Sequence, residues 1–303
     1  MTAVVGLDDL ERMARGVRFL HDEAGKFLEA GHEIPAVGSK AAADLAEFRG
    51  AVSPMEGYVQ GTFLIESAAD QIMALLKTLT EPAQTFAPWT CYRALLETSA
   101  IAAWLLDPDL DGRTRLQRSL ALRYEGLMER AKWVRCAGPG AGQVADVERR
   151  IDQVEAQAEE AGFTKLRNKK GERYGIGQRM PSATEIIGQM TGEETLYRMM
   201  SAVNHGHIWA FQLSYRMPDG SVPTPRPGAG EGVEAFYPVK KTLTTLNAAM
   251  LLAWSAKGFA RPVWYKCLLF GWDSRRLAGV FDAAFDDVGL KPELRYWRSP
   301  SHA

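Results

Sequence analysis

Apolar residues recur at helical spacing along nearly the whole of this 303-residue chain, and this periodicity restricts the fold more than any other feature. Runs of β-branched residues as long as a strand are scarce, so the pattern predicts an all-α protein, a multi-helix bundle. We expect helices near 7–30, 39–50, 54–80, 89–106, 112–136, 143–161, 183–190, 192–214, 239–258, 262–270 and 274–288. The length allows two ordinary domains or one large one. Because the sequence has no internal repeat and no clean linker, we expect a single helical domain over 1–303, with 239–303 as a candidate C-terminal helical layer.

Three short signals mark where helices begin. Ser53-Pro54-Met55-Glu56 combines a capping serine with a proline at the first helical position. Residues 182–185 and 191–194 both have the spacing of a capping box, in which a serine or threonine precedes a glutamate by three positions. The helix over 192–214 is therefore expected to begin at Thr191.

The composition restricts location and partners. With 46% hydrophobic and 24% charged residues, the chain is typical of globular proteins. A net charge of −1 excludes polyanion binding through global charge, so any nucleic-acid or phosphate site has to be a local patch. Cys91, Cys136 and Cys267 form no CxxC pair, which argues against a disulfide framework and favours the reducing cytoplasm.

Neither an export signal nor a membrane span is expected. Residues 1–16 carry acids where a signal peptide has basic residues followed by an apolar run. The most apolar stretches, 94–106 and 246–256, are too short to cross a bilayer and are predicted to be buried core helices.

Two neighbouring predicted helices have opposite charge. Residues 113–135 carry seven basic and two acidic residues, whereas 143–160 carry six acidic and two basic ones. The glycine-rich turn 136–142 separates them. We therefore expect an antiparallel helical hairpin over about 112–161, in which complementary charges select the pairing.

Two segments lack a helical pattern. Residues 163–181 hold six basic residues, one acid and several glycines, and residues 217–232 are rich in proline and glycine. Both are expected to be long irregular loops, the second on the surface.

The most unusual charges lie in the apolar helix 89–106. Arg93 and Glu97 share one face of it at i, i+4 spacing, although the rest of its circumference is apolar. A buried charged pair is costly unless it is well partnered. The pair could belong to a polar site that orients a ligand or a catalytic histidine. The alternative is a structural ion pair that fixes the helix register. Glu66 and Asp70 could add carboxylates to the same site, or lie on a solvated helix face.

A second candidate site lies in the stretch 198–207. Arg198 and His205 are seven residues apart, so they should point the same way from one helix, and Asn204 and His207 extend this polar set. Arginine binds phosphate and histidine exchanges protons near neutral pH, so the pair suits metal-independent cleavage of a phosphodiester. The alternative is that His205 is a hydrogen-bonded core histidine at a helix end, with His207 exposed.

Metal and cofactor sites have little support in the sequence. His205 and His207 with Glu66, Asp70 or Glu97 could ligate iron or zinc, but the Glu-x-x-His motif of a di-iron bundle occurs once, at 29–32. No P-loop, dinucleotide-binding glycine motif, GxSxG or HExxH is present. We therefore expect no metal and no cofactor.

The basic segment 163–181 offers phosphate contacts. Its candidates lie one short helix before the histidine helix, and they are Lys169, Lys170, Arg173 and Arg179, accompanied by Lys165 and Arg167. The alternative is a solvated loop. Tyr174, Trp209 and Phe211 are nearby aromatic residues, of which the last two are predicted to pack in the core.

Four blocks of sequence carry a family resemblance. They are Arg93-Ala-Leu-Leu-Glu97, Trp104-Leu-Leu-Asp-Pro108, the arginines of 113–118 and Ser201-Ala-Val-Asn-His-Gly206. Together, over about residues 55–215, they resemble a group of uncharacterised all-helical proteins common in actinobacteria. This resemblance implies a fold and no activity.

The spacing Arg198-x6-His205 is also similar to the arginine–histidine motif of the HEPN superfamily. Members of that superfamily are helical bundles, often dimeric, and include metal-independent RNases of toxin–antitoxin and phage-defence systems. The resemblance implies a homodimer that acts on RNA, with Arg198 and His205 as the catalytic pair.

Three hypotheses follow from these features. The first is a cytoplasmic HEPN-like endoribonuclease of a defence or stress system, in which His205 is the general acid/base and Arg198 stabilises phosphate charge. The second is a protein or enzyme that binds a small molecule at Arg93, Glu97 and His205 inside the bundle. The third is a non-catalytic helical scaffold.

Overall fold

The structure, a computed structural model, describes residues 7–29, 35–48, 52–80, 84–138, 141–210, 245–275, 277–279 and 282. It confirms the predicted all-α multi-helix bundle. The helices are α1 (Leu7–Glu29), α2 (Lys40–Glu47), α3 (Met55–Thr78), α4 (Ala87–Leu105), α5 (Gly112–Cys136), α6 (Ala141–Glu160), α7 (Ala183–Thr191), α8 (Glu194–Asn204) and α10 (Thr245–Phe270). Within the described chain no helix is both long enough and apolar enough to cross a bilayer.

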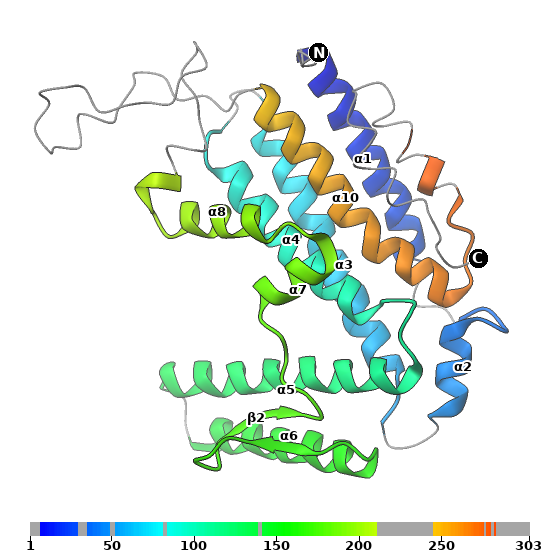
Figure 1. Cartoon of the computed structure of the whole chain (residues 1–303), viewed down its shortest axis with the longest axis vertical. Coiled ribbons are helices and arrows are strands. Elements are labelled where there is room, and N and C mark those ends of the chain that lie inside the picture. Colours follow the sequence, from blue (N-terminus) through cyan, green and yellow to red (C-terminus); the bar gives the residue numbers. More distant parts are fainter. Residues whose placement is uncertain are drawn as a thin grey trace, which may run out of the picture.

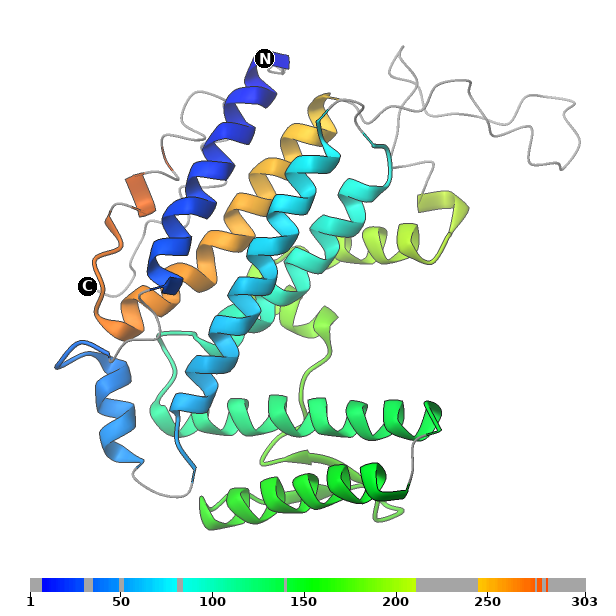
Figure 2. The ribbon, with the colours of Figure 1, turned by 180° about the vertical axis from the view of Figure 1, so that it is seen from behind.

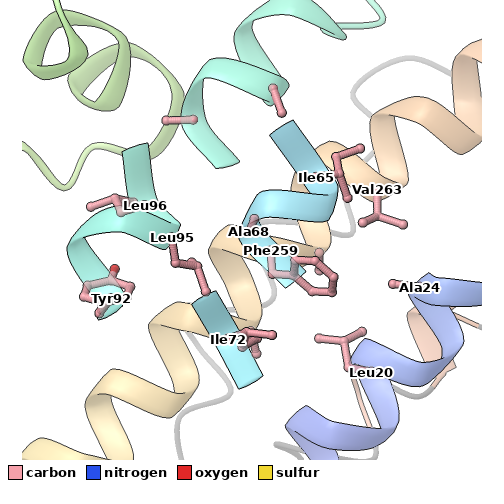
Figure 3. Close-up of a cluster of buried hydrophobic side chains, with 14 of the residues drawn as sticks. Leu20, Ala24, Ile65, Ala68, Ile72, Tyr92, Leu95, Leu96, Phe259 and Val263 are labelled. Atoms are coloured by element: carbon pink, nitrogen blue, oxygen red, sulfur yellow. The ribbon is translucent and has the colours of Figure 1, made fainter. Parts of the chain in front are cut away.

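The bundle is built around α4. Helices α1, α3, α4 and α10 run side by side along the long axis of the molecule, whereas α5 and α6 lie across one end of it (Figures 1 and 2). Figure 3 shows side chains of these four long helices converging on Ile72 and Phe259. Because α4 buries residues around most of its circumference, it is the central helix that its apolar sequence predicts.

A buried ion pair joins this bundle to α5. Arg115 of α5 is fully buried, and its Nε donates to Oδ2 of Asp44 of α2 at 3.1 Å, while the hydroxyl of Tyr58 of α3 donates to the same oxygen at 2.6 Å. The other guanidinium nitrogens donate to backbone oxygens of the α4–α5 connection, at positions 105, 107 and 110. Three helices and one connection therefore meet at a single guanidinium.

The helical hairpin predicted for 112–161 is present as α5 and α6. Its antiparallel direction is shown by Arg113 at the start of α5, which donates to the carbonyl oxygens of Ala161 and Gly162 just after α6. Among the described side chains, one ion pair links the two helices, between Arg135 and Glu148. Most other acids of α6 pair with a different element.

These acids pair with a β-hairpin within 163–181, where an irregular loop was expected, so that expectation is wrong. Strands β1 (Lys165–Arg167) and β2 (Arg173–Ile176) form an antiparallel hairpin that packs on α5 and α6. Its basic residues contact the acids of α6, and the buried Glu155 accepts from Tyr124 and from Arg167, each at 2.8 Å. Burial alone would raise the pKa of Glu155. The two hydrogen bonds and the charges of the neighbouring arginines together have a larger effect in the opposite direction, so the pKa is lowered overall.

Several helix boundaries differ from the predicted ones. The helix expected over 192–214 ends as α8 at Asn204, because Gly206 follows with a left-handed φ of 74°. Helix α10 continues through Pro262, which was expected to divide it, because buried residues such as Phe259 and Val263 anchor it on both sides of the missing N–H. Thr191 ends α7 instead of starting α8, and Gly192 follows it with a left-handed φ of 72°. The capping box at Ser182 and Glu185 is confirmed. The predicted surface loop 217–232 and most of 274–288 lie outside the described residues.

Lys266 of α10 is a buried cation without a close carboxylate in the described chain. Its Nζ donates to Oγ1 of Thr62 at 2.7 Å and lies 5.5 Å from the ring centres of both Phe270 and Trp272. Burial lowers its pKa to about 8, although the charge of Glu66 acts in the opposite direction.

Breaking the buried ion pair should be costly. Replacement of Asp44 by asparagine leaves the Arg115 charge without its counter-charge in a water-free site, so the free energy of unfolding should fall by about 3–5 kcal/mol in urea titrations. The exposed pair of Glu129 and Lys132 is the control, and Glu129→Ala should cost less than about 1 kcal/mol. Equal losses in the two variants would show that Asp44 has no special role.

Lys266 should give a distinct pH dependence of stability. The ammonium group of Lys266 keeps its proton up to about pH 10.5 in the unfolded chain, but only up to about pH 8 in the folded chain. The free-energy cost of burying this charge is therefore present in full below pH 8 and declines as the pH rises from about 8 to about 10.5. Lys266→Met should therefore raise the free energy of unfolding by about 1–3 kcal/mol at pH 7, and by less at pH 10. Urea titrations at both pH values, with Lys77→Met as the exposed control, measure the difference. A variant less stable than the parent at pH 7 would contradict it.

Candidate functional site

Helix α8 has an inner and an outer side, and the two sides carry different polar residues. Tyr197 and Asn204, seven residues apart, contact α4, and Tyr197, Met200 and Val203 are buried. Arg198 and His205 are also seven apart, but each follows an inward residue directly and is therefore turned by about 100° toward solvent. Figures 1 and 2 show α8 crossing α4, with its C-terminal end at the edge of the molecule.

The inner side contacts the predicted charged pair of α4. Nη2 of Arg93 lies 2.8 Å from Oε1 of Glu97 and also donates to the hydroxyl of Tyr197 at 3.3 Å. That hydroxyl donates in turn to Oε1 of Glu97, and the guanidinium lies 5.4 Å from the centre of the tyrosine ring. Burial, followed by the bond to Glu97, raises the pKa of Tyr197. Asn204 accepts from Thr90 at 2.7 Å, which fixes the far end of α8.

This pair is less buried than the sequence predicts. About a quarter of each side chain is exposed, 26% for Arg93 and 28% for Glu97, so the pair lies at the edge of the α4–α8 contact instead of in the centre of the core. The cost of desolvation is correspondingly lower, which explains how two charges fit on an apolar helix.

The outer side holds the proposed catalytic pair. Nε and Nη2 of Arg198 donate to Oε1 of Glu194, one turn earlier, at 2.9 and 2.7 Å, and 65% of the arginine side chain is exposed. His205 ends α8 and is exposed, as is His207. The hypothesis of a small-molecule site formed by Arg93, Glu97 and His205 inside the bundle is therefore wrong, because His205 is exposed on the other side of α8. The alternative that His205 is a hydrogen-bonded core histidine is wrong as well, because its side chain is exposed.

A second polar cluster, at the first turn of α8, links it to α4 and α10. The hydroxyl of Tyr92 donates to Oε2 of Glu193 at 2.5 Å, and Nζ of Lys257 lies 3.7 Å from Oε1 of the same carboxylate. Burial raises the pKa of Glu193 and lowers that of Arg261, whose charge acts on Glu193 from one turn further along α10. This cluster could not be predicted from the sequence, because its members come from three separate helices.

The remaining predicted site residues lie elsewhere. Asp70 is exposed, and Glu66 is half-buried on α3, where its charge acts on Lys266. No group of three or more histidines, cysteines or acids that could hold a metal ion occurs among the described residues.

The predicted phosphate contacts are divided between ion pairs and solvent. Arg173 bonds to acids of α6, with Nη1 3.2 Å from Glu148, and Arg179 pairs with Glu185 at 3.0 Å. Lys169 and Lys170 are exposed at the turn of the β-hairpin. In both ribbon views this hairpin lies on the far side of α5 from α8 (Figures 1 and 2).

Comparison with protein-family models, with curated proteins and with solved structures finds no match to this chain.

The inner contact of α8 should contribute measurably to stability. Tyr197→Phe removes the hydroxyl that bonds to both Arg93 and Glu97, so the free energy of unfolding should fall by about 1–2 kcal/mol in urea titrations. Tyr174→Phe is the matched control at an exposed position and should change it by less than about 0.5 kcal/mol. If both substitutions have the same effect, the hydroxyl of Tyr197 does not anchor α8.

Proposed function

We propose that this protein is a metal-independent endoribonuclease of the HEPN-like type, which acts in the cytoplasm in a defence or stress response. His205 is the general acid/base and Arg198 stabilises the charge of the phosphate. The observation that carries the proposal is the exposure of both side chains on the outer side of one helix whose inner side is anchored.

An exposed pair suits a polymeric substrate better than a small molecule. A polymer chain cannot enter a closed bundle, so its scissile phosphate has to meet catalytic groups at the surface. The inner contacts of Tyr197 and Asn204 hold the helix in place, so Arg198 and His205 are presented from a rigid element.

The reaction needs two proton transfers and one stabilised charge. The 2′-hydroxyl oxygen attacks the adjacent phosphorus as a base removes its proton, the P–O5′ bond breaks, and the departing 5′-oxygen takes a proton from an acid. The products are a 2′,3′-cyclic phosphate and a 5′-hydroxyl. His205 performs one transfer, the exposed His207 two residues away is available for the other, and the arginine stabilises the phosphorane oxygens.

Two further features of this surface suit RNA. Glu194 holds the Arg198 guanidinium through two nitrogens, so a phosphate has only to replace one exposed carboxylate to bind the same donors. Trp209, four residues after His205, is 50% exposed instead of packed in the core as predicted, and an exposed indole ring is a stacking surface for an unpaired base.

Cleavage of RNA by the purified protein is the direct test. A short single-stranded RNA should be cut in the presence of EDTA, whereas DNA of the same sequence, which lacks the nucleophilic 2′-hydroxyl, should stay intact. His205→Ala and Arg198→Ala should each lower the rate by about 100-fold or more. Denaturing gels and mass spectrometry of the cyclic phosphate ends measure both outcomes.

His21→Ala is the matched control, because it removes an imidazole from α1. Its rate should equal that of the parent. Intact RNA after prolonged incubation, or cleavage that survives in His205→Ala, would overturn the proposal.

A further inference from the structure

One side of α5 is covered by the bundle along its first half only. Residues three or four apart on a helix face the same way, so one series of positions follows this side to the last turn. The series consists of Arg115, Ser119, Leu122, Gly126, Arg130 and Trp133. The first three pack against the bundle, where Ser119 donates to Gln60 of α3 at 3.2 Å, whereas the last three are exposed. The second half of α5 therefore extends past the bundle, and its bundle-facing side is uncovered.

The uncovered half of α5 carries a tryptophan and a cation. Trp133 is 66% exposed, although a large aromatic side chain normally buries most of its surface in a core or an interface. The side chain of Arg130, one turn earlier, makes no ion pair or hydrogen bond in the described part of the chain, whereas Lys132 and Arg135 are paired with acids. An exposed indole ring stacks on an unpaired base, and a guanidinium without a carboxylate partner binds a phosphate. This half of α5 therefore offers both contacts that a single strand of nucleic acid uses.

The outer side of α8 is turned toward α7, on the same side of the molecule. Glu194, which holds Arg198, lies against Gly188 of α7, where a Cβ would be 3.4 Å from Oε2 of the carboxylate. In both ribbon views α7 lies between α8 and α5, and α5 and α8 end beyond the bundle in the same direction (Figures 1 and 2). Because α8 lies on the bundle-facing side of α5, Trp133 and Arg198 are both directed toward the region between the two helices.

We propose that the uncovered half of α5 is a second contact surface for single-stranded RNA, on which one base stacks against Trp133 and one phosphate binds Arg130. This inference rests on the proposed function, because the same strand continues to Arg198 and His205 of α8. Stacking and phosphate contacts do not read a base sequence, so the surface selects single strands of any sequence. In a duplex the bases already stack on one another, and Trp133 has no free base to contact.

A second copy of the chain fits this surface less well than RNA does. In a twofold contact centred on Trp133 the same surface of both copies meets, so the two Arg130 side chains come together and repel each other. The whole helix is basic, with seven basic and two acidic residues over 113–135, so the partner helix brings no compensating charge. A strand of RNA brings a phosphate to Arg130 with every nucleotide.

Fluorescence anisotropy with the full chain and a labelled RNA of about 12 nucleotides tests this surface. The riboses carry 2′-O-methyl groups, so the RNA binds but has no nucleophile for its own cleavage. The single strand should bind more tightly than the same sequence in a duplex. Trp133→Ala should weaken the binding by about tenfold, and Trp133→Tyr, which keeps an aromatic ring, by less than about threefold. Arg130→Ala should lower the slope of log affinity against log salt concentration by about 0.7, since it removes one phosphate contact.

Two matched controls lie on other helices. Phe63→Ala removes an aromatic ring of α3 that is 65% exposed, nearly as much as Trp133. Arg18→Ala removes an exposed cation from α1. Both variants should bind the single-stranded RNA as tightly as the parent and with the same salt dependence.

The inference is overturned if Trp133→Ala binds the single strand as tightly as the parent, or if the duplex binds as tightly as the single strand. It is also overturned if sedimentation shows a dimer that Trp133→Ala converts to a monomer, because a second copy then occupies the surface. Cleavage is a separate measurement on unmodified RNA. Binding that depends on Trp133 without any cleavage contradicts the nuclease alone, whereas cleavage together with unchanged affinity in Trp133→Ala contradicts this inference alone.

Discussion

The guanidinium of Arg115, buried against Asp44, is the interaction on which the arrangement of the helices depends. A charge in a water-free interior is tolerated only when all its hydrogen bonds are made, and this one makes them with α2 and with the turn between α4 and α5. Gly112 allows α5 to approach this ion pair closely, because a Cβ at that position would lie 2.8 Å from Oδ1 of Asp44. The direction in which α5 leaves the bundle, and with it the position of α6 and the β-hairpin, is set here.

The helices could be predicted from the sequence because their apolar residues follow a local period, and a period needs no tertiary information. The β-hairpin could not. Its strands are three and four residues long, and its basic side chains are neutralised by acids of α6 that precede it in the chain. A segment that depends on such partners looks like a solvated loop when it is considered alone.

In the candidate site, too, local spacing was predictable, whereas the orientation of the helix in the bundle was not. The separation of Arg198 and His205 predicts that they share one side of a helix, but spacing does not tell which side faces the bundle. The apolar stripe of Tyr197, Met200 and Val203 contained that information, and it places the neighbouring charges outside. The pairing of Arg93 with Glu97 was predictable from i, i+4 spacing, whereas its tyrosine partner from another helix was not.

Helix α8 is bounded by left-handed glycines, Gly192 before it and Gly206 after it, with φ values of 72° and 74°. Glycine adopts this conformation without steric cost, so the chain turns sharply at both ends of this short helix. Its inner side contacts α4 and α10, and its outer side presents an arginine and a histidine to solvent. A ligand that binds one side of α8 and shifts the helix also changes the affinity of the other side. Thermodynamic reciprocity requires that an occupant of the outer side change the affinity of the inner side by the same factor.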